Sequence, residues 1–598
     1  MKSKQTFKLS CQGLLKYSIT LALFSLPVTP ALGAIVESGT TNTTVNQVNN
    51  TPVVNIAAPT GNGISYNQYN EYNVTAAGAV LNNALADAQS QILQQIVASN
   101  PHLTQAAAST ILNEVISSNP SLLEGYQEIL GQQADLILAN PYGITCDGCG
   151  FINTNAASLI VGKVEEFAES GLKYNTFKNQ NRLTILEGGV RGAETLNLIA
   201  PSVDANGPIE ANQEVNVVLG NNIGDLKTAA FEQVEKNTTG RAIDSYLLGG
   251  MISGRIHLVS TNNGSGVNIS GKVRGNENIN NEIVDINVNG DLNITAAQVG
   301  EQTTQRVNLS GQNVRTSGTI DTQTESFKDS GNKEGSLFRH GKYGSTSTTT
   351  KTLNRTQITG KNINVGARKG AYLKATEIQA TDVAVTGEKV ELTNQTVINT
   401  QERTDNNWYM SWRSNYNRTA SQETSTGTEI KAANVSVKAS NGDVLVEGSQ
   451  IDASQTATIN ATKGDVKLLG AVTQKQVKET GYKRNDGAEL RTGSWSTNEI
   501  DQTSNASTIN AGSKVDISAT NNVTTRNAQI SSTRLTSQLD NLFLSERTKP
   551  QIPVLTRTIA LIGAGSVVAQ KPTTTKIIKS LMAAELMRKT ILRSKVIN

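Results

Sequence analysis

The chain has 598 residues, a formal net charge of +3 at pH 7 and only 4% aromatic residues. A nearly neutral chain argues against a general nucleic-acid-binding protein, and the scarcity of aromatic side chains argues against the wide cores of ordinary globular domains. The sequence is instead rich in Thr, Asn, Ser, Val, Ile and Gly, which is typical of many short strands joined by turns.

A secretory signal peptide is predicted over residues 1–33. Lysines in the first 16 residues precede the apolar run Ile19–Leu26, and small residues follow that run up to Ala34. The run is too short for a permanent membrane-spanning helix, and an uncleaved signal anchor is the alternative. Cleavage would also remove Cys11, which leaves two cysteines in the mature chain.

Residues 81–97 are predicted as a helix from their propensity. Leu85, Ile92 and Ile96 would then lie on one side of that helix. The segment 111–116, further along, has the pattern of a strand.

Residues 139–154 read ANPYGITCDGCGFINT and contain Cys146 and Cys149. In the oxidising compartment that the signal peptide implies, two such close thiols tend to form a disulfide. A zinc site would need two more ligands, and none of the three histidines lies at ligand spacing from another. A redox centre needs a helix start, which the flanking glycines oppose. We therefore expect a structural disulfide, with a redox centre and a metal site as alternatives, and we expect no cofactor.

The later strands recur with a period of 20 to 22 residues. Five residues of one unit return 22 positions later, as Val437, Ala439, Gly442, Asp443 and Val444 against Ile459, Ala461, Gly464, Asp465 and Val466. Ile363 is likewise followed by Val383 after 20 positions. This period matches one coil of a solenoid, and because the leucine and asparagine frame of leucine-rich repeats is absent, an all-β, right-handed parallel β-helix fits better. Its narrow interior explains the missing aromatic residues, and a β-sandwich is the alternative.

Three polar stretches interrupt this rhythm, at residues 321–352, 400–427 and 474–507. We expect them to be extra-helical hairpins, because insertions between coils leave the stacking intact. Each carries aromatic residues, whose rings could contact a ligand. We favour the alternative that these rings cover the base of their own hairpins.

The tail after Arg534 departs from the solenoid pattern. Residues 571–598 contain seven basic residues and one acidic residue, with apolar residues spaced as in an amphipathic helix, so an irregular or helical C-terminal tail is expected. Gly563 and Gly565 resemble a nucleotide-binding turn only weakly, because a third glycine and a βαβ unit are absent.

Several blocks between residues 35 and 300, including the cysteine-bearing stretch 133–154, resemble the secretion domain of two-partner secretion exoproteins. This family includes filamentous haemagglutinins, haemolysins and contact-dependent growth inhibition proteins, and the later coils resemble its haemagglutinin-type repeats. The resemblance implies two turns for transporter recognition, formed by Asn100, Pro101, His102 and Leu103 and by Asn140, Pro141, Tyr142, Gly143 and Ile144. The family commonly has asparagine at the third position of each turn. If that asparagine holds the turn, His102 and Tyr142 would alter docking or stability.

The resemblance also implies a domain order and a route. We expect a signal peptide over 1–33, a secretion domain over 34–300, a β-helical repeat region over 301–533 and an atypical tail over 534–598. The family's secretion domain is recognised in the periplasm by an outer-membrane partner transporter, which releases the protein at the surface of a Gram-negative bacterium. A ring closed between Cys146 and Cys149 would be small enough for a narrow pore.

No catalytic constellation emerges, so we expect a protein that is not an enzyme. The leading interpretation is a secreted surface adhesin or haemagglutinin that binds a host or neighbouring cell and no nucleic acid. The alternative is a haemolysin, cytolysin or contact-dependent toxin carrier, possible as a short or truncated member because the tail is too simple for an effector domain. A polysaccharide lyase or hydrolase would need clustered charged residues on one coil face, which the sequence does not offer.

Overall fold

The computed structural model describes residues 34–538, except for short gaps at 169–170, 177–178, 227–230, 233–243, 276–281, 334–339, 410–411 and 486–492. It also describes the short strands at 6–7, 541–545, 558–562, 566–570 and 596–597. Residues 8–33 of the predicted signal peptide, the glycines at 563 and 565, and the basic segment 571–595 lie outside the described residues. None of the described residues belongs to a helix that is long and apolar enough to cross a membrane.

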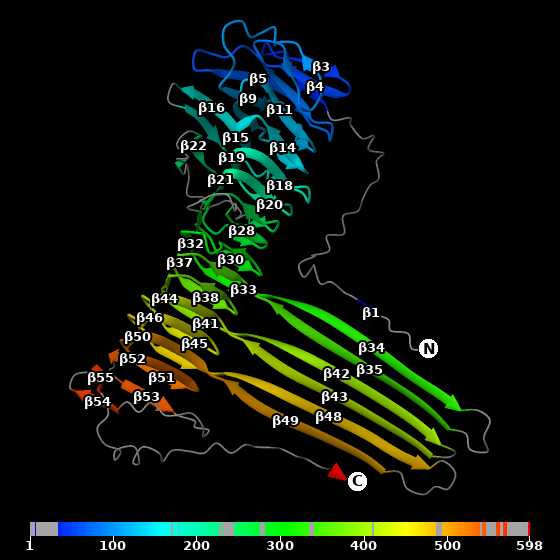
Figure 1. The fold of residues 1–598 in the computed structure, drawn as a ribbon, viewed down its shortest axis with the longest axis vertical. Helices are drawn as coiled ribbons and strands as arrows, with labels where there is room; N and C mark the ends of the chain where they lie inside the picture. The colour runs from blue at the N-terminus through cyan, green and yellow to red at the C-terminus, as the bar shows by residue number, and fades with distance from the viewer. Residues whose placement is uncertain are drawn as a thin grey trace.

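Most of the described chain winds into a parallel β-helix, in which each coil contributes one strand to each of three rows (Figure 1). The first row contains β4 (Thr51–Asn55), β6 (Ala79–Asn83), β11 (Tyr126–Gly131), β14 (Cys149–Ile152), β25 (Met251–Ile252), β28 (Lys272–Arg274), β31 (Gln298–Val299), β36 (Gln357–Thr359) and β39 (Glu377–Gln379). The second row contains β5 (Ile64–Tyr72), β9 (Thr110–Val115), β12 (Ala134–Ala139), β15 (Thr154–Ile160), β26 (Arg255–Ser260), β29 (Ile283–Val288), β32 (Arg306–Gly311), β37 (Asn362–Ala367) and β40 (Asp382–Gly387). Six strands run through both of these rows: β19 (Val190–Ala200), β21 (Ile209–Leu219), β44 (Glu429–Ala439), β46 (Gln450–Ala461), β50 (Ser507–Ala519) and β52 (Ala528–Gln538).

The third row is a separate sheet of 14 parallel strands. It contains β10 (Ser121–Leu123), β13 (Ile144–Cys146), β18 (Leu183–Ile185), β20 (Val203–Ala205), β24 (Ser245–Leu247), β27 (Val267–Ile269), β30 (Leu292–Thr295), β33 (Val314–Ser317), β38 (Gly370–Lys374), β41 (Lys389–Thr393), β45 (Val444–Glu447), β47 (Val466–Leu469), β51 (Asn522–Arg526) and β53 (Asn541–Ser545). The predicted all-β solenoid is therefore confirmed.

The strand register confirms the predicted coil periods. Val437 pairs with Ile459 at the 22-residue interval, and Ile363 pairs with Val383 at the 20-residue interval. Inward positions alternate with outward ones, as in β40, where Val383 and Val385 are buried between exposed or half-buried neighbours. The period-2 pattern of the sequence thus sets which side chains enter the interior.

Ladders of Val, Ile, Leu and Ala fill the solenoid, because the space between the three rows is narrow. The aromatic members of this core among the described residues are Tyr69, Tyr72 and Phe151, all near the N-terminal end. Burial of one aliphatic side chain contributes about 1.5–3 kcal/mol, so the repeated ladder stabilises every coil against its neighbours.

The N-terminal end of the solenoid is closed by antiparallel strands. β2 (Ile35–Glu37) pairs with β5, and β3 (Thr44–Val48) pairs with β4. These pairings cover the edge of the first coil. An uncovered edge would allow edge-to-edge association with another chain.

The predicted helix over residues 81–97 is wrong. This segment contains the end of β6 and two short strands, β7 (Ala88–Gln89) and β8 (Ile96–Val97). β7 and β8 form an antiparallel pair that lies over the outer face of the first row. Ile92 packs there, whereas Leu85 and Ile96 are exposed, so the predicted stripe does not form one face. The Glu128 carboxylate accepts hydrogen bonds from the Gln91 and Ile92 amides at 2.7 and 3.0 Å, and these tertiary contacts override the helix propensity.

A second cover lies on the outer face of the second row. It is the antiparallel sheet of β16 (Lys163–Ala168), β17 (Gly171–Asn175), β22 (Ile223–Asp225) and β23 (Phe231–Glu232). Leu172 and Tyr174 of this sheet pack with Leu112, Ile137 and Ile199 of the second row in a small core outside the solenoid. These outward apolar positions explain why the early strands lack a simple alternating pattern.

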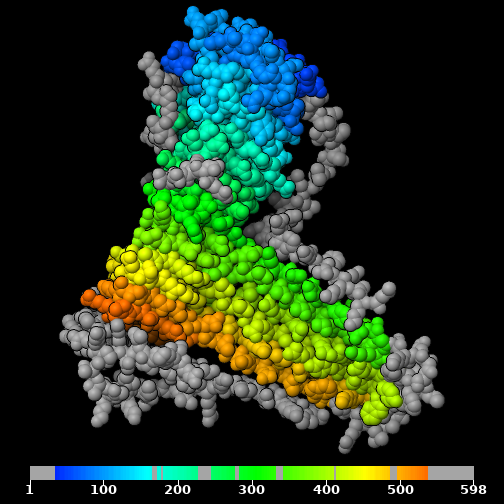
Figure 2. Space-filling model, viewed as in Figure 1, coloured from blue at the N-terminus to red at the C-terminus, as the bar shows by residue number. Residues whose placement is uncertain are grey.

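The three predicted hairpins leave the solenoid after β33, β41 and β47, which confirms them as hairpins. Their strands are β34 (Thr319–Lys333) with β35 (His340–Asn354), β42 (Gln395–Tyr409) with β43 (Trp412–Thr426), and β48 (Ala471–Asn485) with β49 (Gly493–Asn505). The hairpins also pair with one another through β35–β42 and β43–β48. They form one antiparallel sheet, the lateral sheet, which projects far from the rod (Figures 1 and 2).

The hairpins start at residues 319, 395 and 471, so a unit of 76 residues separates them. Each unit contains two coils and one hairpin. Because a hairpin adds two strands and a coil adds one strand spacing of about 4.8 Å, one hairpin on every second coil keeps the lateral sheet in step with the solenoid.

Candidate functional site

The first predicted turn follows β8 at a corner of the solenoid. The Asn100 side chain is buried. Its Nδ2 donates to the Ile56 and Asn82 carbonyls at 2.9 and 2.8 Å, and its Oδ1 accepts from the backbone N–H of His102 at 2.9 Å. The Leu103 amide then donates to the Asn100 carbonyl, and the Leu103 side chain is buried in the core. Asn100 thus closes an Asx-turn and ties it to two earlier segments.

The second predicted turn joins β12 to β13 with the same design. The Asn140 side chain is buried. Its Nδ2 donates to the Asn119 carbonyl at 2.9 Å and to Ser121 Oγ at 3.0 Å, and its Oδ1 accepts from the backbone N–H of Tyr142 at 2.9 Å. Gly143 has φ +115°, a backbone conformation that favours glycine, and Ile144 then enters the core.

The third residue of each turn contributes its backbone amide to the turn, and the first asparagine holds the turn with its side chain. Tyr142 is 46% exposed and its ring points outward, and Pro101 is also exposed. His102 is half-buried, with Nδ1 3.3 Å from the Ile56 carbonyl oxygen. The hydrogen bond that closes each turn is therefore accepted by the side chain of the first asparagine.

Cys146 and Cys149 form a disulfide across the corner between the third row and the first row, with their Cα atoms 5.4 Å apart. Both side chains are buried in the main core. Gly148 between them has φ +75°, and its amide donates to the Gly189 carbonyl of the next coil. Asp147 Oδ1 accepts from the Gly188 amide at 2.9 Å, so this corner is fixed by neighbours as well as by the disulfide.

The structure brings the second turn and the disulfide together and leaves the first turn apart. Asn140 begins the turn that leads into β13, and Cys146 is the last residue of that strand. Asn100 instead bonds to the segments that follow β4 and β6. Groups of three or more His, Cys, Asp or Glu side chains that could hold a metal ion are absent from the part of the chain that the structure describes.

A further set of exposed side chains lies in the lateral sheet, and the sequence prediction placed them incorrectly at the hairpin bases. The rings occur toward the distal tips, where Tyr343, Trp408, Trp412 and Tyr482 are between 39% and 50% exposed. The pairing between hairpins decides which rings share a face. The sequence analysis did not predict this pairing. The 76-residue spacing would have indicated it.

Comparison with known proteins finds two family models in this chain. Residues 34–294 match the TPS secretion domain, and residues 409–498 match the hemagglutinin repeat. The chain is 34% identical over 550 residues to a hemolysin of Proteus mirabilis and 33% identical over 548 residues to a hemolysin of Serratia marcescens. These matches cover 91% and 90% of this chain. The chain carries the secretion domain and a repeat of the two-partner secretion exoproteins.

The chain spans 32% of the length of each of those hemolysins. The toxin CdiA of Escherichia coli is 36% identical over 261 residues, which are 43% of this chain and 8% of the toxin. The crystal structure of the filamentous hemagglutinin secretion domain, at 31% identity, covers 46% of this chain and 93% of its own chain with a TM-score of 0.41. Proteins with the TPS secretion domain are exported across the outer membrane of Gram-negative bacteria to the cell surface or the medium.

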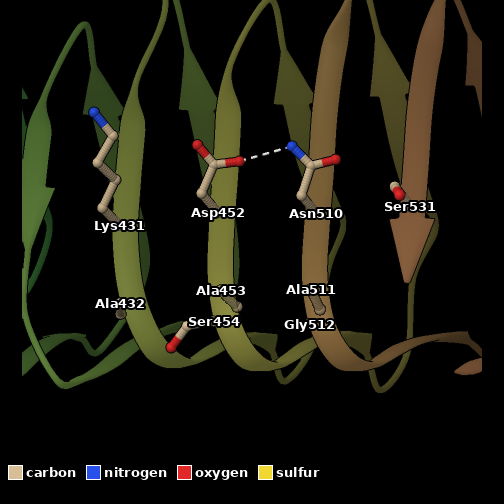
Figure 3. A pocket seen from close by; sticks show the side chains of 9 residues that line it. All are labelled: Lys431, Ala432, Asp452, Ala453, Ser454, Asn510, Ala511, Gly512 and Ser531. Carbon is tan, nitrogen blue, oxygen red and sulfur yellow. Dashed lines mark hydrogen bonds between the residues drawn. The ribbon is translucent and has the colours of Figure 1, made fainter. Parts of the chain in front are cut away.

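The chain also carries a shallow groove of about 530 Å³ on the first-row strands near the C-terminal end of the solenoid (Figure 3). Lys431, Asp452, Asn510 and Ser531 point outward from adjacent strands, and alanines that include Ala453 line the groove where these strands bend. Asn510 Nδ2 donates to Asp452 Oδ1 at 2.7 Å, and Lys431 Nζ lies 2.6 Å from Glu429 Oε1. One carboxylate lines the groove, whereas glycoside hydrolysis commonly uses two.

Proposed function

We propose that residues 34–300 are the part of the chain that the outer-membrane transporter recognises, that residues 301–533 form a repeat region that presents a binding surface, and that 534–598 form a separate tail. The two asparagine turns support the first assignment, because each presents an outward residue, Pro101 or Tyr142, from a rigid corner. In this proposal the buried asparagines position the docking surface and the outward residues contact the transporter.

Export of a Tyr142→Ala variant tests this assignment. In cells that also produce the partner transporter, we expect the amount in the medium to fall several-fold while the urea midpoint of the purified protein is unchanged. Thr104→Ala, at an exposed position just beyond the first turn, is the control. Unchanged export of Tyr142→Ala would contradict a docking role for that residue.

We propose that the exported protein is an adhesin that binds the surface of a host or neighbouring cell, without enzymatic activity and without nucleic acid as a ligand. The observation that carries this proposal is the lateral sheet, which has half-exposed rings toward its distal end. Exposed aromatic side chains of this kind are enriched where proteins bind partners.

Haemolysis is the second candidate function, either by this chain or as the carrier part of a larger toxin. It is favoured by the identity of 34% to a hemolysin over 91% of the chain. Agglutination of red cells by the secreted protein without release of haemoglobin supports adhesion. Release of haemoglobin that depends on the partner transporter supports haemolysis and contradicts the adhesin proposal.

A further inference from the structure

We propose that the transporter-docking surface at the second turn extends onto the next coil, where Asn181 positions Tyr142 for the transporter. This inference rests on the proposed function and deepens it, because it names a further residue on which recognition depends. The segment that carries it consists of Asn179, Gln180 and Asn181, and we call it the third turn.

The third turn has the same design as the first two turns. Asn179 Oδ1 accepts from the backbone N–H of Asn181 at 2.9 Å, which closes the turn. Asn179 Nδ2 donates to the Pro141 carbonyl at 2.7 Å and to the Val161 carbonyl at 3.3 Å. The first asparagine thus closes this turn and ties it to the second turn, in the way that Asn140 ties the second turn to the coil before it.

The side chain at the third position of this turn also bonds to the second turn. Asn181 Nδ2 donates to the Pro141 carbonyl at 2.9 Å. A carbonyl oxygen has two lone pairs, so this oxygen can accept from both side-chain amides. Because Asn179 closes the third turn, the Asn181 side chain acts on the second turn and not on its own.

The peptide group between Pro141 and Tyr142 is therefore held at both of its polar atoms. Its N–H donates to Asn140 Oδ1 within the second turn, and its carbonyl oxygen accepts from the third turn. The proline ring fixes φ of Pro141, whereas Gly143 has φ +115° and no side chain that restricts it. The orientation of this peptide group thus determines the direction in which the Tyr142 side chain leaves the backbone.

Backbone contacts place the second and third turns directly against each other. β13 pairs with β18 in parallel, with Ile144 opposite Leu183, so the turns that lead into these strands lie in adjacent coils. The Arg182 carbonyl oxygen is 3.5 Å from the position that a Cβ atom would take at Gly143. A partner that contacts Tyr142 therefore meets the third turn on the same corner of the solenoid.

The surface that the two turns form is open to solvent. Tyr142 is 46% exposed, and Gln180 and Asn181 are exposed as well. Substitutions at exposed positions change the free energy of unfolding little, so the Asn181 bond affects the orientation of Tyr142 more than the stability of the fold. A docking residue that is already held in its bound orientation loses less conformational entropy on binding, which strengthens the complex.

Export of an Asn181→Ala variant, in cells that also produce the partner transporter, tests this inference. We expect the amount in the medium to fall about threefold, which is within the range that one hydrogen bond contributes. The urea midpoint of the purified full chain should stay that of the parent. Gln180→Ala is the matched control, because Gln180 is exposed and lies between the two asparagines, and its export should be unchanged.

Two further measurements separate a positioning residue from a second contact residue. If Asn181 acts through Tyr142, a Tyr142→Ala, Asn181→Ala double variant is exported as well as Tyr142→Ala alone. Hydrogen exchange reports the turn itself: the backbone amides of residues 142 and 143 should exchange faster in Asn181→Ala and at the rate of the parent in Gln180→Ala.

Four results would overturn the inference: export of Asn181→Ala at the level of the parent, losses that multiply in the double variant, unchanged hydrogen exchange at the second turn, or a loss of export that follows a lower urea midpoint. If Tyr142→Ala is exported like the parent, the proposed docking role of Tyr142 fails and the inference fails with it. If export falls with Tyr142→Ala and not with Asn181→Ala, the docking role stands and only the inference about Asn181 fails.

Discussion

The Asn140 side chain joins two segments of the solenoid. It donates to the preceding coil at Asn119 and Ser121 and accepts from its own turn at Tyr142. We expect Asn140→Ala to lower the free energy of unfolding by about 2–4 kcal/mol, because a buried side chain loses three hydrogen bonds that each contribute about 1 kcal/mol net. The urea midpoint, followed by circular dichroism, measures this change.

Tyr142→Asn restores the family's residue at the third position and is the matched control. Since the Tyr142 ring is outward and exposed, the urea midpoint should change by less than the equivalent of about 0.5 kcal/mol. A large change with Tyr142→Asn and none with Asn140→Ala would reverse the roles assigned to the two positions.

Burial raises the pKa of the Glu282 carboxyl above its ordinary value, although Thr303 and Thr304 donate hydrogen bonds to it. The folded state therefore holds the proton more tightly than the unfolded state, and ionisation of Glu282 destabilises the fold as pH rises through the folded pKa. We expect Glu282→Gln to raise the Tm at pH 7.5 and to leave it unchanged at pH 3.5, where the glutamate is protonated in both states. A gain at pH 3.5 that matches the gain at pH 7.5 would contradict this account.

At the scale of single elements, the corner closed by Cys146 and Cys149 is stabilised twice, by its disulfide and by bonds to the next coil. The disulfide closes a ring of four residues, for which the chain-entropy model gives about 2 kcal/mol. We expect a reducing agent to lower the free energy of unfolding of the parent by this modest amount, measured from the shift of its urea midpoint. The same agent should have no effect on a Cys146→Ala, Cys149→Ala double variant. Complete unfolding on reduction would show that the corner depends on the disulfide alone.

The elements that sequence predicted correctly are those that local pattern determines. Ile363 and Val383, or Val437 and Ile459, alternate with polar neighbours and repeat at the coil period, so the strands and their stacking follow directly. The segment around Ile92 was predicted wrongly, because its apolar residues pack outward onto β6 and β11 under the control of the distant Glu128 carboxylate. Helix propensity depends on the residues of the segment itself and does not include a contact with a distant residue.

The candidate sites divide in the same way. The turns at Asn100 and Asn140 are visible in the sequence because the turn and its chemistry are local. The shared face of the lateral-sheet rings is not local in this sense, because Tyr343 and Tyr482 are 139 positions apart and share a face only through the pairing between hairpins.

At the scale of the whole molecule, the 76-residue unit predicts which deletions the fold tolerates. Deletion of residues 395–470 removes one hairpin and two coils, so β48 would follow β41 and the remaining hairpins would still be two coils apart. We expect this shortened chain to fold, with protease resistance of the lateral sheet like that of the parent. Limited proteolysis and circular dichroism provide the measurement.

Deletion of residues 428–449 is the matched comparison, because it removes a single coil and no hairpin strand. The second and third hairpins would then leave the solenoid one strand spacing apart, about 4.8 Å, whereas a hairpin needs twice that distance. We expect β43 and β48 to lose their pairing and become sensitive to protease. Equal resistance of both shortened chains would contradict the coupling between sheet and solenoid.

The corner asparagines give the solenoid a direction of assembly. Asn100 bonds to Ile56 and Asn82, Asn140 to Asn119, and Asn179 to Pro141, so each of these side chains finds its acceptors in chain that comes earlier. A polypeptide that emerges from a membrane with its N-terminal end first would meet a finished layer at every such corner. Each new layer would then be locked as it arrives, and backward slippage would cost the bonds already made.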